Sequence, residues 1–139
     1  MRVLAIDYGE QRTGIAISDI LNTMAGQAFV LKTRPKSALL HEIAKICEEN
    51  RIDSIALGLP KNMDGTLGER AQLSQSFAGE LKTATGITAS FIDERLTTVN
   101  ASRLLHSAGK NAKKQKGSID AVAAALILET FLAQNRQKT

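Results

Sequence analysis

The chain has 139 residues, of which 43% are hydrophobic and 23% are charged. These values are typical of one globular domain and exclude an intrinsically disordered chain, whose apolar content would be too low to form a core. We therefore expect a single domain over residues 1–139. The 18 Lys and Arg residues outnumber the 14 Asp and Glu residues, and the resulting net charge of +4 favours a polyanionic partner.

Cys47 is the only cysteine, which excludes an internal disulfide and a cysteine-based metal cage. The N-terminal residues resemble a first strand and lack the long apolar stretch of a signal peptide. The longest uninterrupted apolar run, residues 121–128, is too short to cross a bilayer. We expect a cytoplasmic protein without a membrane anchor.

The first third of the chain predicts three short strands, at Arg2 to Ile6, Thr13 to Ser18 and roughly Gln27 to Lys32. Residues 7–12 are rich in turn formers, so the first two strands are expected to pair as an antiparallel hairpin. The third strand would extend this hairpin into a meander.

After Pro35 the apolar residues recur at helical spacing, which predicts a helix capped by Ser37 and ending near Asn50. Residues 54–58 then predict a buried strand. The next element would be a second helix from about residue 68, with Gly86 beyond its end. Its apolar face would contain three residues spaced by four, Leu73, Phe77 and Leu81.

Residues 87–92 predict a fifth strand, and two helices follow, one from about residue 98 to 109 and one from Ser118 to about Gln134. The order βββ-α-β-α-β-α-α joins a meander to strands with helical crossovers. We therefore expect an α/β fold with a mixed sheet and helices on both faces.

A basic segment at residues 109–117 separates the last two helices. It is flanked by glycines, and it contains four lysines, Lys110, Lys113, Lys114 and Lys116. A mobile loop that contacts nucleic acid and an ordinary solvated loop explain the segment equally well.

Carboxylates stand at the ends of the predicted elements. Asp7 ends the first strand, Asp93 and Glu94 end the fifth, and Asp120 opens the last helix two residues after Ser118. If the first, fourth and fifth strands are parallel, their carboxyl ends meet at one sheet edge, where open α/β sheets bind ligands. Hydrolysis of a phosphodiester at neutral pH needs an activated water and a clamp on the leaving oxygen, which two divalent ions supply. A few carboxylates are enough to hold Mg²⁺.

Each acid also has a simpler explanation. Asp7 can cap a turn, and Asp120 can stabilise a helix N-terminus. Asp93 and Glu94 can pair as surface charges with arginine residues, either Arg95 or Arg70. Because neighbouring strand residues point in opposite directions, only one of the pair 93 and 94 is expected to face a metal.

The segment after the fourth strand, residues 58–65, is a loop punctuated by glycine and proline. Its Lys61 and Asn62 are candidates to contact phosphate or sugar, because such contacts position a nucleic acid without reading its sequence. Arg12, close to Asp7 in the sequence, is another candidate phosphate ligand.

Four motifs together resemble the YqgF family, whose members are described as Holliday junction resolvases and as nucleases of precursor 16S ribosomal RNA. The resemblance covers nearly the whole chain in the family's order, and its motifs are residues 5–19, 58–65, 93–98 and 118–124. It implies a ribonuclease H-like fold with a five-stranded sheet in the order 3-2-1-4-5. At residues 10 and 11, Glu and Gln stand where a neutral residue and a lysine are common, which leaves Arg12 as the cation beside Asp7.

The resemblance also implies a metal site and a substrate. The family's metal-binding and catalytic acids fall on Asp7, Glu94 and Asp120, with Asp93 as a lesser candidate, and the metal would be Mg²⁺ or Mn²⁺. Asp7 would bridge two ions. The substrate would be structured nucleic acid, with the 5′ end of precursor 16S rRNA favoured and the ribosome or its precursors as further partners. The expected nucleic-acid contacts are Arg12, Lys61, Asn62, Arg95, Lys113, Lys114 and Lys116.

Three alternatives remain open from the sequence. Resolution of four-way DNA junctions uses the same chemistry but requires a two-fold symmetric dimer, and either a monomer or a weak homodimer is compatible with the chain. A fragment of an ATP-dependent kinase or chaperone is disfavoured by length, because those enzymes clamp ATP between two such domains. A non-catalytic RNA-binding module is disfavoured because all the acids are present.

Overall fold

The computed structural model describes residues 2–19, 21, 25–95 and 116–137 of the chain. The side chains of residues 116–118, 136 and 137 lie outside this description. Its helices and strands, in chain order, are β1 (Val3–Tyr8), β2 (Arg12–Ser18), β3 (Ala25–Lys32), α1 (Lys36–Glu49), β4 (Ser54–Leu59), α2 (Glu69–Thr85), β5 (Ala89–Asp93) and α5 (Lys116–Gln137).

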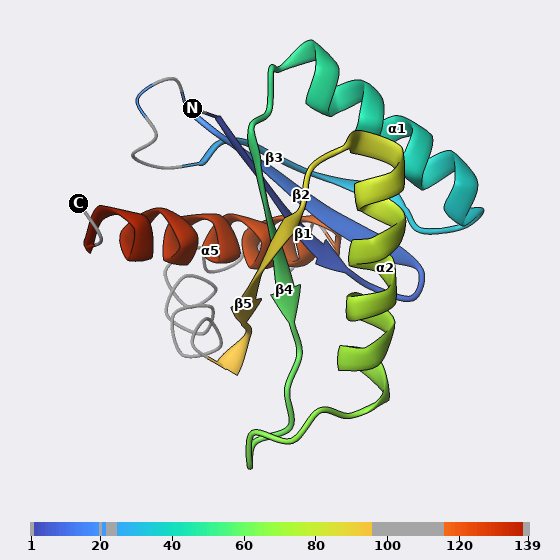
Figure 1. Cartoon of the computed structure of the whole chain (residues 1–139), viewed down its shortest axis with the longest axis vertical. Helices are drawn as coiled ribbons and strands as arrows, with labels where there is room; N and C mark the ends of the chain where they lie inside the picture. Colours follow the sequence, from blue (N-terminus) through green and yellow to red (C-terminus); the bar gives the residue numbers. More distant parts are fainter. Residues whose placement is uncertain (1, 20, 22–24, 96–115, 138–139) are drawn as a thin grey trace.

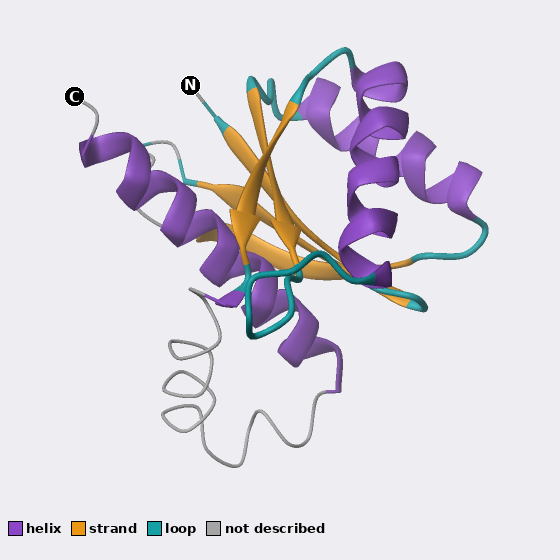
Figure 2. Cartoon of the chain, turned by 60° about the horizontal axis from the view of Figure 1, so that its bottom comes forward, coloured by secondary structure: helices purple, strands orange, loops and turns teal. Residues whose placement is uncertain are grey.

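The five strands form one mixed sheet in the order β3-β2-β1-β4-β5, which confirms the expected topology. β1 pairs antiparallel with β2, and it pairs parallel with β4, which in turn pairs parallel with β5. Helices α1 and α2 cover one face of the sheet, and α5 crosses the other face (Figure 1, Figure 2). The carboxyl ends of β1, β4 and β5 therefore lie at one edge.

Side-chain alternation along β1 divides the apolar residues between two cores. Leu4 and Ile6 are fully buried among residues of α1 and α2, whereas Val3 and Ala5 are buried against α5. Successive residues of a strand point to opposite faces, and each fully buried Leu or Ile side chain contributes about 1.5–3 kcal/mol. Continued past Ile6, the alternation puts Asp7 on the α5 face of the sheet.

Helix α1 begins one residue after Pro35, which occupies the N-cap position in an extended conformation. The carbonyl of Pro35 accepts hydrogen bonds from the backbone of Ala38 and Leu39. Ser37 therefore lies in the first turn, and its assignment as the cap was wrong. The fixed φ of proline suits the start of a helix, and this favours an earlier start than the serine indicated.

Helix α2 begins after Gly68 and ends at Gly86, as the sequence predicted. Gly86 adopts a left-handed conformation with φ of +78°, and its N–H donates to the carbonyl of Lys82 at 2.8 Å. Phe77 is buried, but Leu73 is 47% exposed, so the expected apolar face is incomplete. Leu73 lines a cavity beside the end of β1. Helical spacing predicts which face a residue lies on, but it does not predict such a cavity.

Two further boundaries differ from expectation. β5 begins at Ala89 rather than residue 87, and α5 already includes Lys116. Ser118 thus lies within α5 rather than before it, and Asp120 is in the second turn. The expected helix at residues 98–109 lies outside the described residues. Within the described ranges, no helix combines the length and apolarity needed to cross a membrane.

Candidate functional site

Asp7 occupies the central position of the carboxylates at the sheet edge. It is half-buried near the end of β1, and its register partner on β2 is Gly14. Asp7 pairs with β2, and the residues before it, up to Ile6, pair with β4 on the other side of β1. A rigid central strand therefore presents this carboxylate.

Glu94 follows β5 directly and is held next to Asp7. Its backbone N–H donates to the carbonyl of Leu59 at 3.1 Å, which fixes the chain as it leaves β5. Its carboxyl group lies over Gly58, where an added Cβ would approach Oε1 to 2.9 Å. The glycine thus leaves the space that the carboxyl group occupies.

The environment of Glu94 favours its protonated form. Burial raises the pKa of Glu94 to about 8, aided by a hydrogen bond to Asp7 and by the negative charge of that residue, while Arg70 acts in the opposite direction. In this hydrogen bond the protonated Glu94 carboxyl donates to the Asp7 carboxylate. Two acids that share a proton in this way form a pair to which a cation would bind favourably.

Asp120 reaches the same edge from α5. The helix approaches β2 so closely that a Cβ on Gly14 would lie 2.1 Å from the carbonyl oxygen of Asp120. Because Gly14 is the register partner of Asp7, this contact places Asp120 on the same face as Asp7. Burial raises the pKa of Asp120, the charge of Asp7 adds to the increase, and Arg12 opposes it.

Asp93 has a different partner from its neighbour Glu94. Its Oδ2 lies 2.7 Å from Nη2 of Arg95, and its Oδ1 accepts from the backbone N–H of Arg95 at 3.0 Å. The hydrogen bonds from Arg95, with its positive charge, hold the pKa of Asp93 below its ordinary value. The surface-pair alternative from the sequence therefore describes Asp93, whereas Glu94 faces Asp7.

The loop after β4 is closed by its own hydrogen bonds. Asn62 exchanges backbone hydrogen bonds with Thr66 and Gly65, and its Nδ2 donates to Oγ1 of Thr66 at 2.9 Å. Arg95 joins this loop to β5, because Nη1 donates to the carbonyl of Met63 at 3.3 Å. Lys61 precedes this closed turn and is half-buried. Two of the expected nucleic-acid contacts, Asn62 and Arg95, are thus already engaged in structural interactions.

The remaining expected contacts are basic residues on other elements. Arg12 is exposed at the start of β2 and acts electrostatically on Asp120. Lys113 and Lys114 lie outside the described residues. Lys116 is the first described residue of α5, and its side chain is likewise outside the description.

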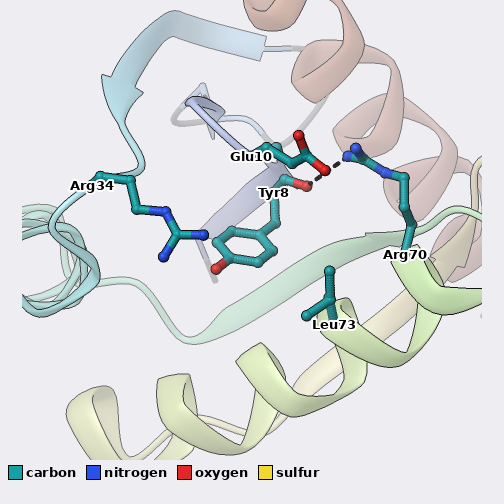
Figure 3. Close-up of a pocket in the computed structure, with 6 residues that line it drawn as sticks. Tyr8, Glu10, Arg34, Arg70 and Leu73 are labelled. Carbon is teal, nitrogen blue, oxygen red and sulfur yellow. Dashed lines mark hydrogen bonds between the residues drawn. The ribbon is translucent and has the colours of Figure 1, made fainter.

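A small cavity on the other side of β1 was missed by sequence reasoning. Its walls contain two arginines, Arg34 and Arg70, and the side chain of Tyr8 (Figure 3). Arg70 had been considered only as an ion-pair partner of the acids. Arg34 and Arg70 are far apart in the sequence, so their positions did not predict a cavity. The one available signal was Tyr8, which directly follows Asp7 in the same motif.

The donor chemistry of the three acids suits a hard divalent cation. Oxygen ligands are those that Mg²⁺ and Mn²⁺ prefer. A positive ion would also offset the burial and the negative charge of Asp7, which together disfavour ionisation of Glu94 and Asp120. Even so, within the described parts of the chain no group of three or more His, Cys, Asp or Glu side chains is arranged to hold a metal ion. Metal binding at these acids would therefore need their carboxylates to move.

The sheet order, with one helical layer on each face, defines the ribonuclease H-like class of proteins. The structure of RuvC from T. thermophilus in complex with a Holliday junction substrate has the same fold, with a TM-score of 0.61 and 18% identity over 97% of this chain and 96% of that one. A family model described as "RuvX: Holliday junction resolvase" matches residues 1–134. The chain therefore belongs to the RuvX family, which is also called YqgF.

Relatives of similar length extend this comparison. A protein of Halothermothrix orenii is 41% identical over 134 residues, covering 95% of this chain and 94% of its own. A protein of Carboxydothermus hydrogenoformans is 43% identical over 133 residues, covering 95% and 96%. Both carry the name "Putative pre-16S rRNA nuclease".

Proposed function

We propose that this protein is a metal-dependent nuclease that hydrolyses phosphodiester bonds in structured RNA, with the 5′ end of precursor 16S rRNA as its substrate. The relatives' names supply the RNA, and the fold class agrees with nuclease chemistry. The proposal treats residues 1–139 as one domain, because the described helices all pack on one sheet. It places the protein in the cytoplasm, with precursor ribosomal particles as partners.

The observation that supports the proposal is the interaction of Asp7 with both Glu94 and Asp120, although the three lie far apart in sequence. Asp7 lies in β1, Glu94 follows β5 and Asp120 lies in α5. These three positions meet at the carboxyl edge of the sheet. Such an edge is where α/β sheets bind ligands. A structural role alone would not require two carboxylates with raised pKa values next to a third.

The three acids would hold Mg²⁺ or Mn²⁺. A bound pair of such ions supplies an activated water and stabilises charge on the leaving oxygen. Asp7, at the centre, would contact both ions, while Glu94 and Asp120 would complete the set. Glu94 must first release the proton that it shares with Asp7. Asp93 is assigned no metal contact in this proposal, because Arg95 holds it.

Basic residues and Asn62 would hold the RNA backbone around the acids. Arg12, Lys61 and Asn62 lie in β2 and in the loop after β4, and Arg95 joins that loop to β5. The expected contacts from Lys113, Lys114 and Lys116 remain part of the proposal. Contacts of this kind bind RNA by charge and shape and leave its sequence unread.

The test is cleavage of a 5′-extended 16S rRNA precursor fragment by wild type, Asp7→Asn, Asp93→Asn and the control Glu42→Gln, with Mg²⁺ or with EDTA. A metal ion stabilises the transition state by several kcal/mol, so Asp7→Asn should lower the rate at least about a hundredfold. Asp93→Asn should retain most activity, and Glu42→Gln should match wild type, because Glu42 is exposed on α1. Full activity of Asp7→Asn would refute the assignment.

Holliday junction resolution is the second candidate, favoured by the description of the family model and by the junction-bound RuvC structure. It predicts a two-fold symmetric dimer that nicks both strands of a four-way junction at paired positions. Mass measurement in solution and mapping of nicks on a synthetic junction would decide between the two substrates. RNA binding without metal-dependent cleavage of either substrate would indicate a non-catalytic binding module.

A further inference from the structure

The cavity that the sequence did not reveal lies where β1, the segment after β3 and α2 meet (Figure 3). Six residues line it, Tyr8, Gly9, Glu10, Arg34, Arg70 and Leu73. Its volume is about 40 Å³. A water needs roughly 10–15 Å³ on this scale, so the cavity accommodates a group of a few heavy atoms, such as a phosphate, and is too small for a nucleobase.

The floor of the cavity is held firmly. The ring of Tyr8 stacks on Phe77 of α2, with ring centroids 3.9 Å apart and planes 7° from parallel. The carbonyl of Tyr8 accepts a hydrogen bond from Nη2 of Arg70 at 3.5 Å. These contacts join the end of β1 to α2.

The charged groups at the cavity favour an anion. Arg34 and Arg70 approach from different elements, and within the described residues neither has a carboxylate at ion-pair distance. Glu10 is the one acidic residue of the lining, and it is exposed. A guanidinium group presents a planar set of donors that matches a phosphate, and two of them would bind one phosphate from both sides.

The location of the cavity separates it from the acid site. Tyr8 packs with Phe77 on the α1 and α2 face, whereas Asp7 lies on the α5 face with Asp120. Arg70 nevertheless acts to lower the pKa of Glu94, so the cavity lies within electrostatic reach of the acid site. A phosphate between the two arginines would therefore be a neighbour of the one that the acids attack. It would belong to a nucleotide beyond the cleaved bond, on a strand that passes over the sheet edge.

A second cavity continues the positive surface. It is lined by Gln11, Arg12, Lys32 and Arg34, so Arg34 belongs to both cavities. Arg12 and Lys32 are register partners on β2 and β3. The cations thus form a path from α2 across the turn to the outer strand.

We propose that the cavity between Arg34 and Arg70 is a phosphate subsite that holds the substrate strand at a position outside the cleaved bond. The inference rests on the proposed nuclease function for its substrate and extends it to residues with no assigned role. Glu10 at the rim weakens the site, so its removal should strengthen binding, and this opposite sign distinguishes a phosphate subsite from a structural role of the arginines.

The test measures binding of a short single-stranded RNA by fluorescence anisotropy in EDTA, where no cleavage occurs. Arg34→Gln and Arg70→Gln should each raise Kd about tenfold or more, because a charged hydrogen bond contributes about 1.5–3 kcal/mol and each 1.4 kcal/mol is tenfold in Kd. Each should also lower the salt slope of log K by about 0.7, the value for one phosphate of a single strand. Glu10→Gln should lower Kd about two- to threefold, by weakening a repulsion of about 0.5 kcal/mol.

Lys45→Gln serves as the control, because it removes one exposed positive charge on α1, away from both cavities. Its Kd should change less than about twofold. Equal Kd values for wild type and both arginine variants, or weaker binding by Glu10→Gln, would overturn the proposal. Unchanged thermal midpoints of the variants show that folding is intact.

Two additions separate the possible sources of the phosphate. RNA with a 5′-phosphate and RNA with a 5′-hydroxyl are compared, and a difference that disappears in Arg70→Gln assigns a terminal phosphate, while equal binding assigns an internal one. Thermal stabilisation by inorganic phosphate that depends on the arginines, with RNA binding unaffected, would instead assign a free anion and refute the strand subsite. Because binding is measured without metal, failure of this proposal is distinguishable from failure of Asp7→Asn to lose cleavage.

Discussion

At the scale of single residues, the pair Asp7 and Glu94 affects the stability of the folded protein when no cation is bound. Burial disfavours the ionised form of Glu94, and the hydrogen bond and the negative charge of Asp7 disfavour it further, so Glu94 holds a proton. Glu94 retains that proton to about pH 8. Without metal, the ionised pair therefore opposes folding.

This opposition has a definite pH dependence. The pKa of Glu94 in the folded protein, about 8, is above its ordinary value of 4.5, so between these values the folded state binds more protons than the unfolded state. The free energy of unfolding contributed by this group therefore falls as pH rises from about 4.5 to 8, and the loss is complete above pH 8.

We predict that Glu94→Gln stabilises the metal-free protein at pH 8.5 by roughly 2–4 kcal/mol, because the amide cannot ionise. The gain should shrink toward zero near pH 5. Chemical denaturation in EDTA at both pH values measures it, with Glu42→Gln on the exposed face of α1 as the control. A gain that is equal at the two pH values would contradict the explanation. The same variant should lose metal-dependent cleavage.

The two neighbours at the end of β5 illustrate what sequence can and cannot predict. Alternation predicted that only one of Asp93 and Glu94 would face the other acids, and the structure gives that orientation to Glu94. Two features determine which residue faces the acids. The guanidinium of Arg95 forms an ion pair with Asp93, and Gly58 leaves space for the carboxyl group of Glu94. Neither the choice of ion pair nor the space over a glycine is visible in the order of residues.

At the scale of elements, glycines determine how closely the sheet and its surroundings approach the acids. A Cβ on Gly58 would lie 2.7 Å from Cδ1 of Ile127 and 2.9 Å from Oε1 of Glu94. A side chain there has to displace the tip of the Ile127 side chain and the carboxyl group of Glu94. Gly79, in the exposed middle of α2, has nothing within 4 Å of the same added atom.

We predict opposite effects for alanine at these two glycines. Gly58→Ala should destabilise the protein by about 1–3 kcal/mol, as overpacking does, and should reduce metal-dependent cleavage by displacing Glu94. Gly79→Ala should stabilise it by about 0.5–1 kcal/mol, because alanine favours the helix, and should leave cleavage unchanged. Urea denaturation and the cleavage assay test both. Normal stability and activity of Gly58→Ala would show that the space is not needed.

Element boundaries were predictable where local chemistry decides them. Gly68 and Gly86 delimit α2 as expected, because a left-handed C-terminal glycine is a local signal. The start of α1 was misassigned, because Pro35 took the cap position ahead of Ser37. The cavity between α2 and β1 was not predictable, because it depends on the packing of Tyr8 against Phe77, residues 69 positions apart.

At the scale of the whole molecule, the reactivity of Cys47 measures how often the larger core opens. It is 7% exposed and packs with buried residues of the core beneath α1 and α2. Burial raises the pKa of its thiol to about 11, from 9.0 for an unperturbed thiol. Since the thiolate is the reacting form, the folded protein holds this group in an unreactive state.

We predict that iodoacetamide at pH 8 alkylates Cys47 at least about a hundredfold more slowly in the native protein than in urea, because the thiolate is scarcer and access is blocked. Gly58→Ala should react faster than wild type, by about tenfold for each 1.4 kcal/mol of lost stability. Mass spectrometry of timed samples measures the rates. Equal rates in the folded and unfolded chains would show that the core opens freely.

The order of the elements along the chain has a consequence for biosynthesis. The core beneath α5 contains Val3 and Ala5 from the first strand and Leu128 from the last described helix, and Asp120 arrives only with that helix. A nascent chain that has emerged only as far as Glu94 has two of the three acids but lacks the cover for one face of its sheet. It therefore cannot bring the three acids together until translation has passed α5, so an unfinished polypeptide would lack the proposed site.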